Sequence, residues 1–241
     1  GQTVNSYDDG QRSFAQLLDE VAQIDGIRRI RFTSPYPADF NDETIEAMGR
    51  LPQVCPSLHL PVQSGSDPQL EAMRRGYSIG EYRQLVQRLR TEIPDLAITT
   101  DIIVGFCGES DDDFRQTVEL MQEVRFDSAF MFRYSERSGT FAHKGMADDV
   151  PDDVKGARLQ QIIEMQESIS RETNQAWVGR TVEVLVEGRS RRPDADGQPT
   201  YFGRSPQGKV TILSDPVEMN QLVQVKIERT TSHTLYGALQ R

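Results

Sequence analysis

The ten residues LHLPVQSGSD, from Leu58 to Asp67, mark the point where a predicted strand turns directly into a helix. An apolar run ends near Pro61, passes through the polar Gln63 and breaks at Gly65. Asp67 is a favourable N-cap, and Pro68 suits the first turn of a helix, so the pattern predicts a helix from Pro68 onward. Because ligands of α/β proteins bind at the carboxyl ends of strands, we expect a site beside Gln63.

Strands and helices alternate through the first 150 residues. The periodicity predicts strands at 30–34, 58–62, 97–104 and 129–134, and helices at 13–24, 42–51, 80–92 and 111–124, besides the short one from residue 68. Repeated strand–helix units indicate an α/β fold with a parallel sheet. The pattern alone leaves open whether the sheet is a partial barrel or doubly wound. A long amphipathic helix is predicted over residues 154–177.

The last 65 residues or so have a different character. Short apolar runs at 182–186, 201–203, 210–213, 223–227 and 234–239 are separated by Gly, Pro, Asp and Asn. Five short strands in this space predict a small all-β barrel. We therefore expect two domains, residues 1–173 and residues 174–241.

Composition excludes several classes of protein. The 241 residues are 37% hydrophobic and 27% charged, with no apolar run that could span a bilayer and no signal peptide. Two distant cysteines offer no disulfide framework and predict a reducing, cytoplasmic compartment. The net charge is −10, yet residues 174–241 carry nine Lys and Arg against seven Asp and Glu. A mildly basic tail is compatible with RNA binding.

Five motifs in order along the chain carry a family resemblance. They are GQTVNSY (1–7), RFTSPYPADF (31–40), LHLPVQSGSD (58–67), DIIVGFCGES (101–110) and RYSERSGTFA (133–142). Together they resemble the radical-SAM methylthiotransferases, most closely the MiaB type that modifies tRNA. The resemblance implies a partial parallel (βα) barrel whose N-terminal part is missing, followed by a TRAM domain, which is a small RNA-binding barrel. It also implies that this chain is the C-terminal part of a larger enzyme.

The resemblance implies a chemistry as well. The family inserts a methylthio group at carbon 2 of isopentenyl-adenosine beside the anticodon of tRNA. One S-adenosyl-L-methionine (SAM) supplies the methyl group, and another is cleaved to a 5′-deoxyadenosyl radical. The CxxxCxxC loop that holds the 4Fe–4S cluster is absent from this sequence. We therefore expect no metal site in this chain, with the ligands of both family clusters outside it, and the sequence identifies neither sulfur donor nor electron donor.

Other functions remain open at this stage. A related enzyme could modify an aspartate of a ribosomal protein or a threonylcarbamoyl-adenosine in tRNA. Because the cluster cysteines are absent, a non-catalytic RNA-binding module is a candidate of another class.

Strand parity selects the first candidate residues. Gln63 and His59 share the less apolar face of one strand, and Asp101 lies on the corresponding face of the next. The resemblance implies that Gln63 and Asp101 hold the SAM ribose and that Arg75 pairs with the SAM carboxylate. The alternatives are an Asp101 that satisfies backbone or threonine groups and a solvated Arg75. Arg74 is expected to be solvated, and His59 to be a hydrogen-bonded structural residue.

The resemblance extends to further positions. Cofactor contacts are implied for Ser64, Ile103, Gly105, Gln2 and Asn5. Glycines at 105 and 108 would let the backbone approach the adenine of SAM. Substrate or RNA contacts are expected for Arg133, Tyr134 and Arg137, which follow the last strand of the sheet, and for Arg189, Arg191, Arg192, Tyr201, Phe202 and Arg204 in the tail. The alternatives are ion pairs in the first group and a solvated hairpin in the second.

Overall fold

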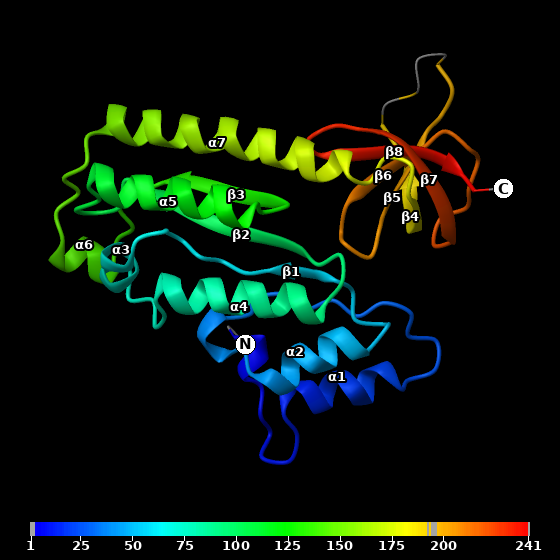
Figure 1. Ribbon diagram of the computed structural model, residues 1–241, viewed down its shortest axis with the longest axis horizontal. Coiled ribbons are helices and arrows are strands. Elements are labelled where there is room, and N and C mark those ends of the chain that lie inside the picture. Colours follow the sequence, from blue (N-terminus) through cyan, green and yellow to red (C-terminus); the bar gives the residue numbers. More distant parts are fainter. Residues whose placement is uncertain (1–2, 192, 194–196, 241) are drawn as a thin grey trace. The chain divides into compact units, whose positions relative to one another are not determined.

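The computed structural model describes residues 3–191, 193 and 197–240. These divide into two compact units, residues 1–166 and residues 167–241, called here the sheet unit and the barrel unit. The division falls within helix α7 (Asp152–Gln175), as does the predicted boundary between residues 173 and 174. Figure 1 shows the elements of both units.

The sheet unit is built on three parallel strands in the order β1-β2-β3. They are β1 (Ser57–His59), β2 (Ala97–Val104) and β3 (Ser128–Arg133). The helices before the sheet are η1 (Val4–Ser6), α1 (Phe14–Ala22), η2 (Pro37–Asp39) and α2 (Asp42–Arg50). Helices α3 (Asp67–Ala72) and α4 (Ile79–Glu92) connect β1 to β2, α5 (Asp111–Val124) connects β2 to β3, and the short α6 (Phe141–Gly145) precedes α7.

One face of the sheet carries the hydrophobic core. Ile98, Thr100, Ile102 and Val104 of β2 are fully buried, whereas Thr99, Asp101 and Ile103 are only partly buried, as the period of two requires. This face packs against α4 and α5, which run alongside the strands in Figure 1. Ile162 of α7 joins the same core. The opposite face carries Asp101 together with the apolar Ile103, Phe130 and Phe132, none of which belongs to that core.

Serine caps explain where the longer helices begin. Ser13, Ser78 and Ser110 each accept a hydrogen bond from the backbone three residues on and receive the reciprocal bond that completes a capping box. The predicted starts of α1, α4 and α5 agree with the structure within about one residue for this local reason.

Three local predictions were wrong. Residues 30–34 form no strand, and only Ile30 makes an isolated bridge, because the prolines that follow cannot donate to a ladder. Strand β1 ends at His59, two residues before Pro61. The N-cap of α3 is Ser66, while the carboxylate of Asp67 accepts instead from the N–H of Ile79 at the start of α4 (2.7 Å). Helix α6 has no counterpart among the predicted elements.

The barrel unit is a closed five-stranded barrel in the order β4-β5-β6-β8-β7. Its strands are β4 (Thr181–Arg189), β5 (Tyr201–Arg204), β6 (Val210–Leu213), β7 (Leu222–Thr230) and β8 (Thr234–Leu239). Val184, Val225 and Leu235 fill the interior. A Cβ at Gly203 or Gly237 would lie 2.1 Å from a carbonyl oxygen of the neighbouring strand, so only glycine permits the tight closure.

Candidate functional site

A pocket of about 510 Å³ lies at the carboxyl ends of the sheet strands. The strands supply Asp101 and Ile103 from β2 and Phe132 and Arg133 from β3. Other parts of the wall come from the end of α3 and from residues 140–142 at the start of α6. The site therefore forms where parallel sheets ordinarily bind ligands.

Gln63, Arg75 and Asp101 converge on this pocket. The same three residues also line a neighbouring hollow of about 310 Å³. Backbone hydrogen bonds place Gln63 beside β2, because its N–H donates to Asp101 O and its carbonyl accepts from Ile103 N, both at 2.9 Å. Gln63 adopts a φ of +75°, which costs a non-glycine residue about 1–3 kcal/mol. The surrounding structure thus holds this side chain at the pocket against backbone strain.

Asp101 has one close polar neighbour on the next strand. His59 Nε2 lies 3.4 Å from Asp101 Oδ1, and His59 Nδ1 lies 2.9 Å from the hydroxyl of Thr99. His59 is thus hydrogen-bonded within the sheet, as expected. Asp101 lines both the pocket and the neighbouring hollow, on the face of the sheet away from the helices.

The two adjacent arginines differ in their surroundings. Arg75 lines the pocket, and its buried Nε has no hydrogen-bond partner among the described residues. Arg74, expected to be solvated, stacks over the ring of Phe141 with its guanidinium carbon 3.3 Å from the ring centroid. Arg75 is therefore one of the cations that line the pocket, together with Arg133 and Arg137.

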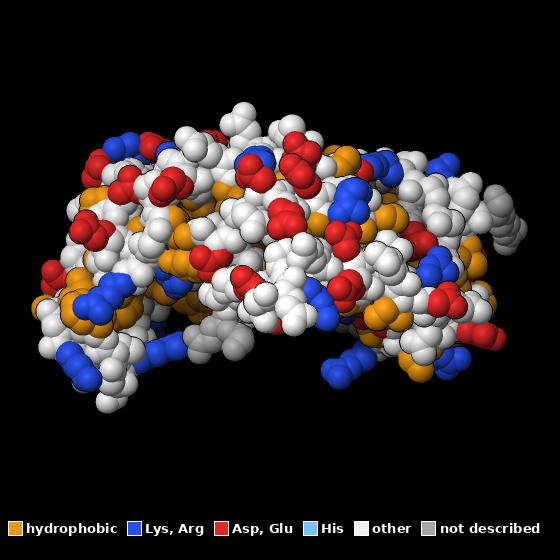
Figure 2. Space-filling model, turned by 90° about the horizontal axis from the view of Figure 1, so that it is seen from below, with side chains coloured by type: hydrophobic (Ala, Val, Ile, Leu, Met, Phe, Trp, Pro, Cys, Tyr) orange, Lys and Arg blue, Asp and Glu red, His pale blue; other side chains and the backbone are white. Residues whose placement is uncertain are grey.

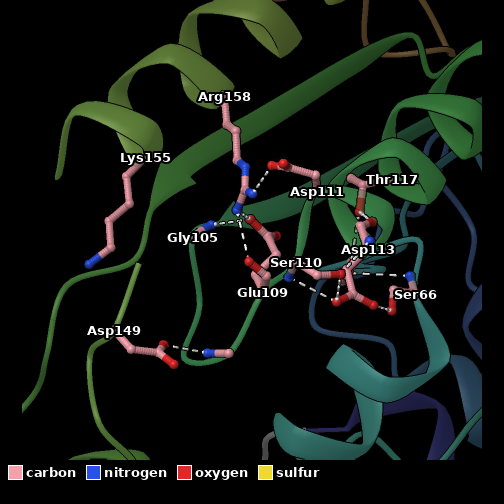
Figure 3. A network of polar contacts seen from close by, with 12 residues as sticks. Ser66, Gly105, Glu109, Ser110, Asp111, Asp113, Thr117, Asp149, Lys155 and Arg158 are labelled. Carbon is pink, nitrogen blue, oxygen red and sulfur yellow. Dashed lines mark hydrogen bonds and ion pairs between the residues drawn. The ribbon is translucent and has the colours of Figure 1, made fainter. Parts of the chain in front are cut away.

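Of the four residues QSGS (63–66), only Gln63 lines the pocket. The Ser64 hydroxyl contacts that of Thr117 in α5 at 3.3 Å, and Gly65 N donates to the same hydroxyl at 2.9 Å. The Ser66 hydroxyl donates to Asp113 at 2.5 Å (Figure 3). The structure therefore places Ser64 away from the pocket, contrary to its expected contact with the cofactor, and uses this run to fasten the loop to α5.

Asp113 stays ionised in this arrangement. Burial alone would raise the pKa of its carboxyl, but hydrogen bonds from the hydroxyls of Ser110 and Ser66 and from the Ser110 N–H outweigh burial and hold the pKa below its ordinary value. The ionised carboxylate then serves two acceptor roles, at the capping box of α5 and at the loop after β1.

Gly105 is required by a neighbour in the protein. It has a φ of +70°, and a Cβ there would lie 2.3 Å from Lys155 Cγ of α7. Lys155 is 2% exposed, bonds Asp148 at 2.5 Å and lies 5.5 Å from the ring of Tyr134. The stem of Lys155 thus occupies the space that a side chain at position 105 would need, and the approach of Gly105 to adenine stays a prediction. Lys155 was not among the expected site residues.

A buried ion pair anchors the loop after β2. Arg158 Nη1 lies 2.7 Å from Glu109 Oε2, and Nη2 lies 2.7 Å from Asp111 Oδ1 (Figure 3). Gly105 N also donates to Glu109 Oε2. Burial is the largest influence on the Glu109 carboxyl and raises its pKa, although Arg158 and the Gly105 N–H oppose it. The first turns of α7 thus hold the loop that carries Phe106 to the pocket.

The residues after β3 complete the pocket wall. Arg133, Tyr134 and Arg137, for which substrate contacts were expected, all line it, and Ser135 does so as well. The Tyr134 ring meets that of Phe106 edge-on at 4.8 Å. Burial, with a contribution from the neighbouring Cys107 thiol, raises the pKa of Tyr134 to about 12, so its hydroxyl remains protonated at neutral pH.

The N-terminal candidates lie elsewhere. The Asn5 side chain donates to Tyr36 O at 2.9 Å and accepts from Tyr36 N at 2.8 Å, which holds the segment beside the smaller hollow. Asn5 is not among the residues that line either cavity, whereas Tyr36 lines the smaller one. Gln2 lies outside the described residues.

The barrel residues expected to meet RNA are partly engaged with the protein. Arg189 lies over the ring of Tyr201 at 5.8 Å, Arg204 pairs with Glu187, and the ring of Phe202 packs at Gly188. Arg191 is exposed, and Arg192 lies outside the described residues.

An arginine–aromatic pair on strands β7 and β8 was not predicted. The guanidinium carbon of Arg229 lies 3.5 Å from the ring centroid of Tyr236 on the adjacent strand. Only the strand pairing brings them together, so no local signal marks the pair. Basic and acidic side chains are interspersed on the face of the molecule in Figure 2.

Cysteine and histidine offer no metal site among the residues that the structure describes. No three His, Cys, Asp or Glu side chains cluster there in a way that could hold an ion. Cys55 and Cys107 are both buried. Over the same residues, no helix combines the length and apolar character needed to cross a membrane.

Comparison with known proteins decides the family. The model of the radical SAM superfamily matches residues 1–121, which is half of the chain. The chain belongs to the radical SAM superfamily. The TRAM domain model matches residues 175–239, which covers the closed barrel. Membership of the superfamily implies SAM and an iron–sulfur cluster as cofactors. The two matches also confirm the predicted fold, an α/β sheet followed by a small β-barrel.

Three relatives share the printed name tRNA-2-methylthio-N(6)-dimethylallyladenosine synthase. The protein from Chlorobium limicola is 47% identical over 98% of this chain and 53% of its own length. Those from Rhodopirellula baltica and Porphyromonas gingivalis are 42% and 46% identical over 98% of this chain and 51% of theirs. The chain thus spans about half the length of the curated relatives it matches. Among solved structures, the radical SAM enzyme coproporphyrinogen III oxidase from Escherichia coli superposes with a TM-score of 0.49 at 14% identity, over 86% of this chain and 50% of that one.

Proposed function

We propose that this chain supplies the SAM-binding sheet and the RNA-binding barrel of an enzyme that methylthiolates N6-dimethylallyladenosine in tRNA. The observation that carries the proposal is the convergence of Gln63, Arg75 and Asp101 on one pocket, in a chain whose relatives share that activity in their names. Those names favour dimethylallyladenosine over the ribosomal-protein and threonylcarbamoyl-adenosine alternatives.

The donor set of the pocket suits SAM. The guanidinium of Arg75 would pair with the SAM carboxylate, since charge-assisted bonds to carboxylates are among the strong ones. Asp101 and Gln63 would bind the ribose hydroxyls. A hydroxyl can donate a hydrogen bond to the carboxylate of Asp101, and it can donate to or accept from the side-chain amide of Gln63. Ile103 and Phe106 supply an apolar wall. When bound, SAM provides the methyl group and, with a cluster, the radical chemistry, while these residues orient it.

The described residues do not fit a 4Fe–4S cluster, because a cluster needs thiolates at set spacing and the two cysteines here are buried apart. We place the ligands of both clusters in the part of the relatives that this chain does not span. The barrel would contact tRNA through arginines beside aromatic rings, such as Arg189 with Tyr201.

Calorimetric titration of SAM into the reconstituted full-length enzyme tests the site. Asp101→Ala removes charge-assisted hydrogen bonds of about 1.5–3 kcal/mol, so SAM should bind about tenfold or more weakly. The matched control is Asp25→Ala, at an exposed loop position. Unchanged SAM affinity in both Asp101→Ala and Arg75→Ala would refute the assignment. Mass spectrometry of nucleosides from treated tRNA tests the activity itself.

A further inference from the structure

Two phenylalanines of β3 are exposed next to the pocket. Phe130 and Phe132 are 58% and 53% exposed, although large apolar side chains on a sheet are ordinarily buried. The strand register pairs Phe130 with Asp101 and Phe132 with Ile103. Because paired residues of parallel strands project to the same side, both rings share the pocket face of the sheet.

The alternation along β3 separates the two rings from the core. Ala129 and Met131 turn to the opposite face and pack against the hydrophobic core. A strand that needed only to cover the core could carry polar residues at 130 and 132. Neighbouring exposed apolar side chains instead mark a binding surface.

One ring lines the pocket, and the other contacts a residue of the neighbouring hollow. Phe132 lines the pocket together with Ile103, and the Phe130 ring lies edge-on to that of His59 at 5.9 Å. Arg133 and Arg137 line the same pocket, so cations suited to phosphate stand beside the aromatic surface. An aromatic surface flanked by arginines matches a nucleotide whose base carries an apolar substituent.

We infer that Phe130 and Phe132 form a platform for the adenine ring and dimethylallyl group of the substrate, and thereby select prenylated over unprenylated adenosine. The inference rests on the proposed function and adds to it the residues that determine specificity. Aromatic side chains stack on bases, and an apolar pocket gains affinity with each added carbon of a ligand. The competing occupant of this face is a protein segment from the remainder of a longer chain.

The test uses two tRNA anticodon stem-loops that differ only in the dimethylallyl group. Their affinities for the full-length enzyme are measured by fluorescence anisotropy for the wild type, Phe130→Ala and Phe132→Ala. The wild type should prefer the prenylated RNA by about tenfold or more, as expected for several apolar carbons. Each substitution should reduce that preference to about twofold or less, and thermal melting should be unchanged because both rings are exposed. Ile24→Ala, at a residue 56% exposed after α1, is the control and should retain the full preference.

The outcomes separate the platform from the proposed function. Loss of preference in both phenylalanine variants, with intact melting, supports the platform. If the phenylalanine variants retain the preference for the prenylated RNA, the platform is refuted. If their melting temperature also falls, the refutation has a cause, namely that a protein segment covers this face. If the wild type has no preference but still methylthiolates the prenylated RNA, only the platform fails. If the wild type leaves that RNA unmodified, the proposed function fails.

Discussion

Replacing Arg158 by methionine should destabilise the sheet unit strongly. The guanidinium is 7% exposed and bonds the carboxylates of Glu109 and Asp111 at 2.7 Å each. The Glu109 side chain is fully buried, and its Oε1 has no hydrogen-bond partner among the described residues. Methionine keeps much of the packing of the arginine stem but leaves the buried carboxylate of Glu109 without its cation.

The magnitude follows from this burial. Breaking a buried pair by removing one partner costs about 3–5 kcal/mol. For a unit of this size, about 2–4 °C is lost per kcal/mol, so the melting transition of the sheet unit should fall by roughly 6–20 °C. Arg83→Met is the matched control, because the Arg83–Glu123 pair is exposed and such pairs contribute about 0–1 kcal/mol.

The deficit should depend on pH. Burial raises the pKa of Glu109 above its ordinary value of 4.5, and loss of Arg158 removes a group that lowers it. A carboxyl whose pKa is raised by folding binds more protons in the folded state than in the unfolded state. The free energy of unfolding therefore falls as the pH rises above the pKa that the carboxyl has in the unfolded chain. The deficit of Arg158→Met should thus be smaller at about pH 5 than at about pH 8.

Differential scanning calorimetry of wild type and both variants at the two pH values measures these effects. The reasoning would be refuted if the melting temperature of Arg158→Met lay within about 2 °C of the wild-type value at the higher pH. Such a shift is too small for the loss of a buried ion pair. An equal deficit at both pH values would show that the Glu109 carboxyl does not carry the effect.

Three further predictions concern the glycine loop, the barrel and the cluster. Gly105→Ala and Gly108→Ala should both cost backbone strain in urea unfolding, because both glycines have a positive φ. Gly105→Ala should cost about 1–3 kcal/mol more, because only its Cβ would meet Lys155. Replacing Arg189 and Arg191 by alanine should flatten the dependence of tRNA affinity on salt in filter binding, and an unchanged slope would place the RNA surface elsewhere. Anaerobic reconstitution of the 241-residue chain should yield no stoichiometric cluster in iron and sulfide assays, and about four irons per chain would contradict this.

Local sequence signals determined most of the fold. The residues of β2 and α5 were predicted at their observed bounds, because alternation and capping are properties of neighbouring residues. Strand parity also predicted that Gln63 and Asp101 share a face, since the direction of side chains in a strand has a fixed period. The prediction failed at 30–34, where the segment gained no strand partner beyond an isolated bridge.

Tertiary structure alone decided which polar residues meet the pocket and which hold the protein together. Ser66 bonds Asp113 across 47 residues of sequence, and Arg158 bonds Glu109 across 49. The sequence by itself determined the order of the elements, the family motifs and the face of Asp101. It could not predict that Ser64 contacts α5 or that Gly105 contacts Lys155. Such contacts depend on how separate helices pack against the sheet, and no local periodicity encodes that packing.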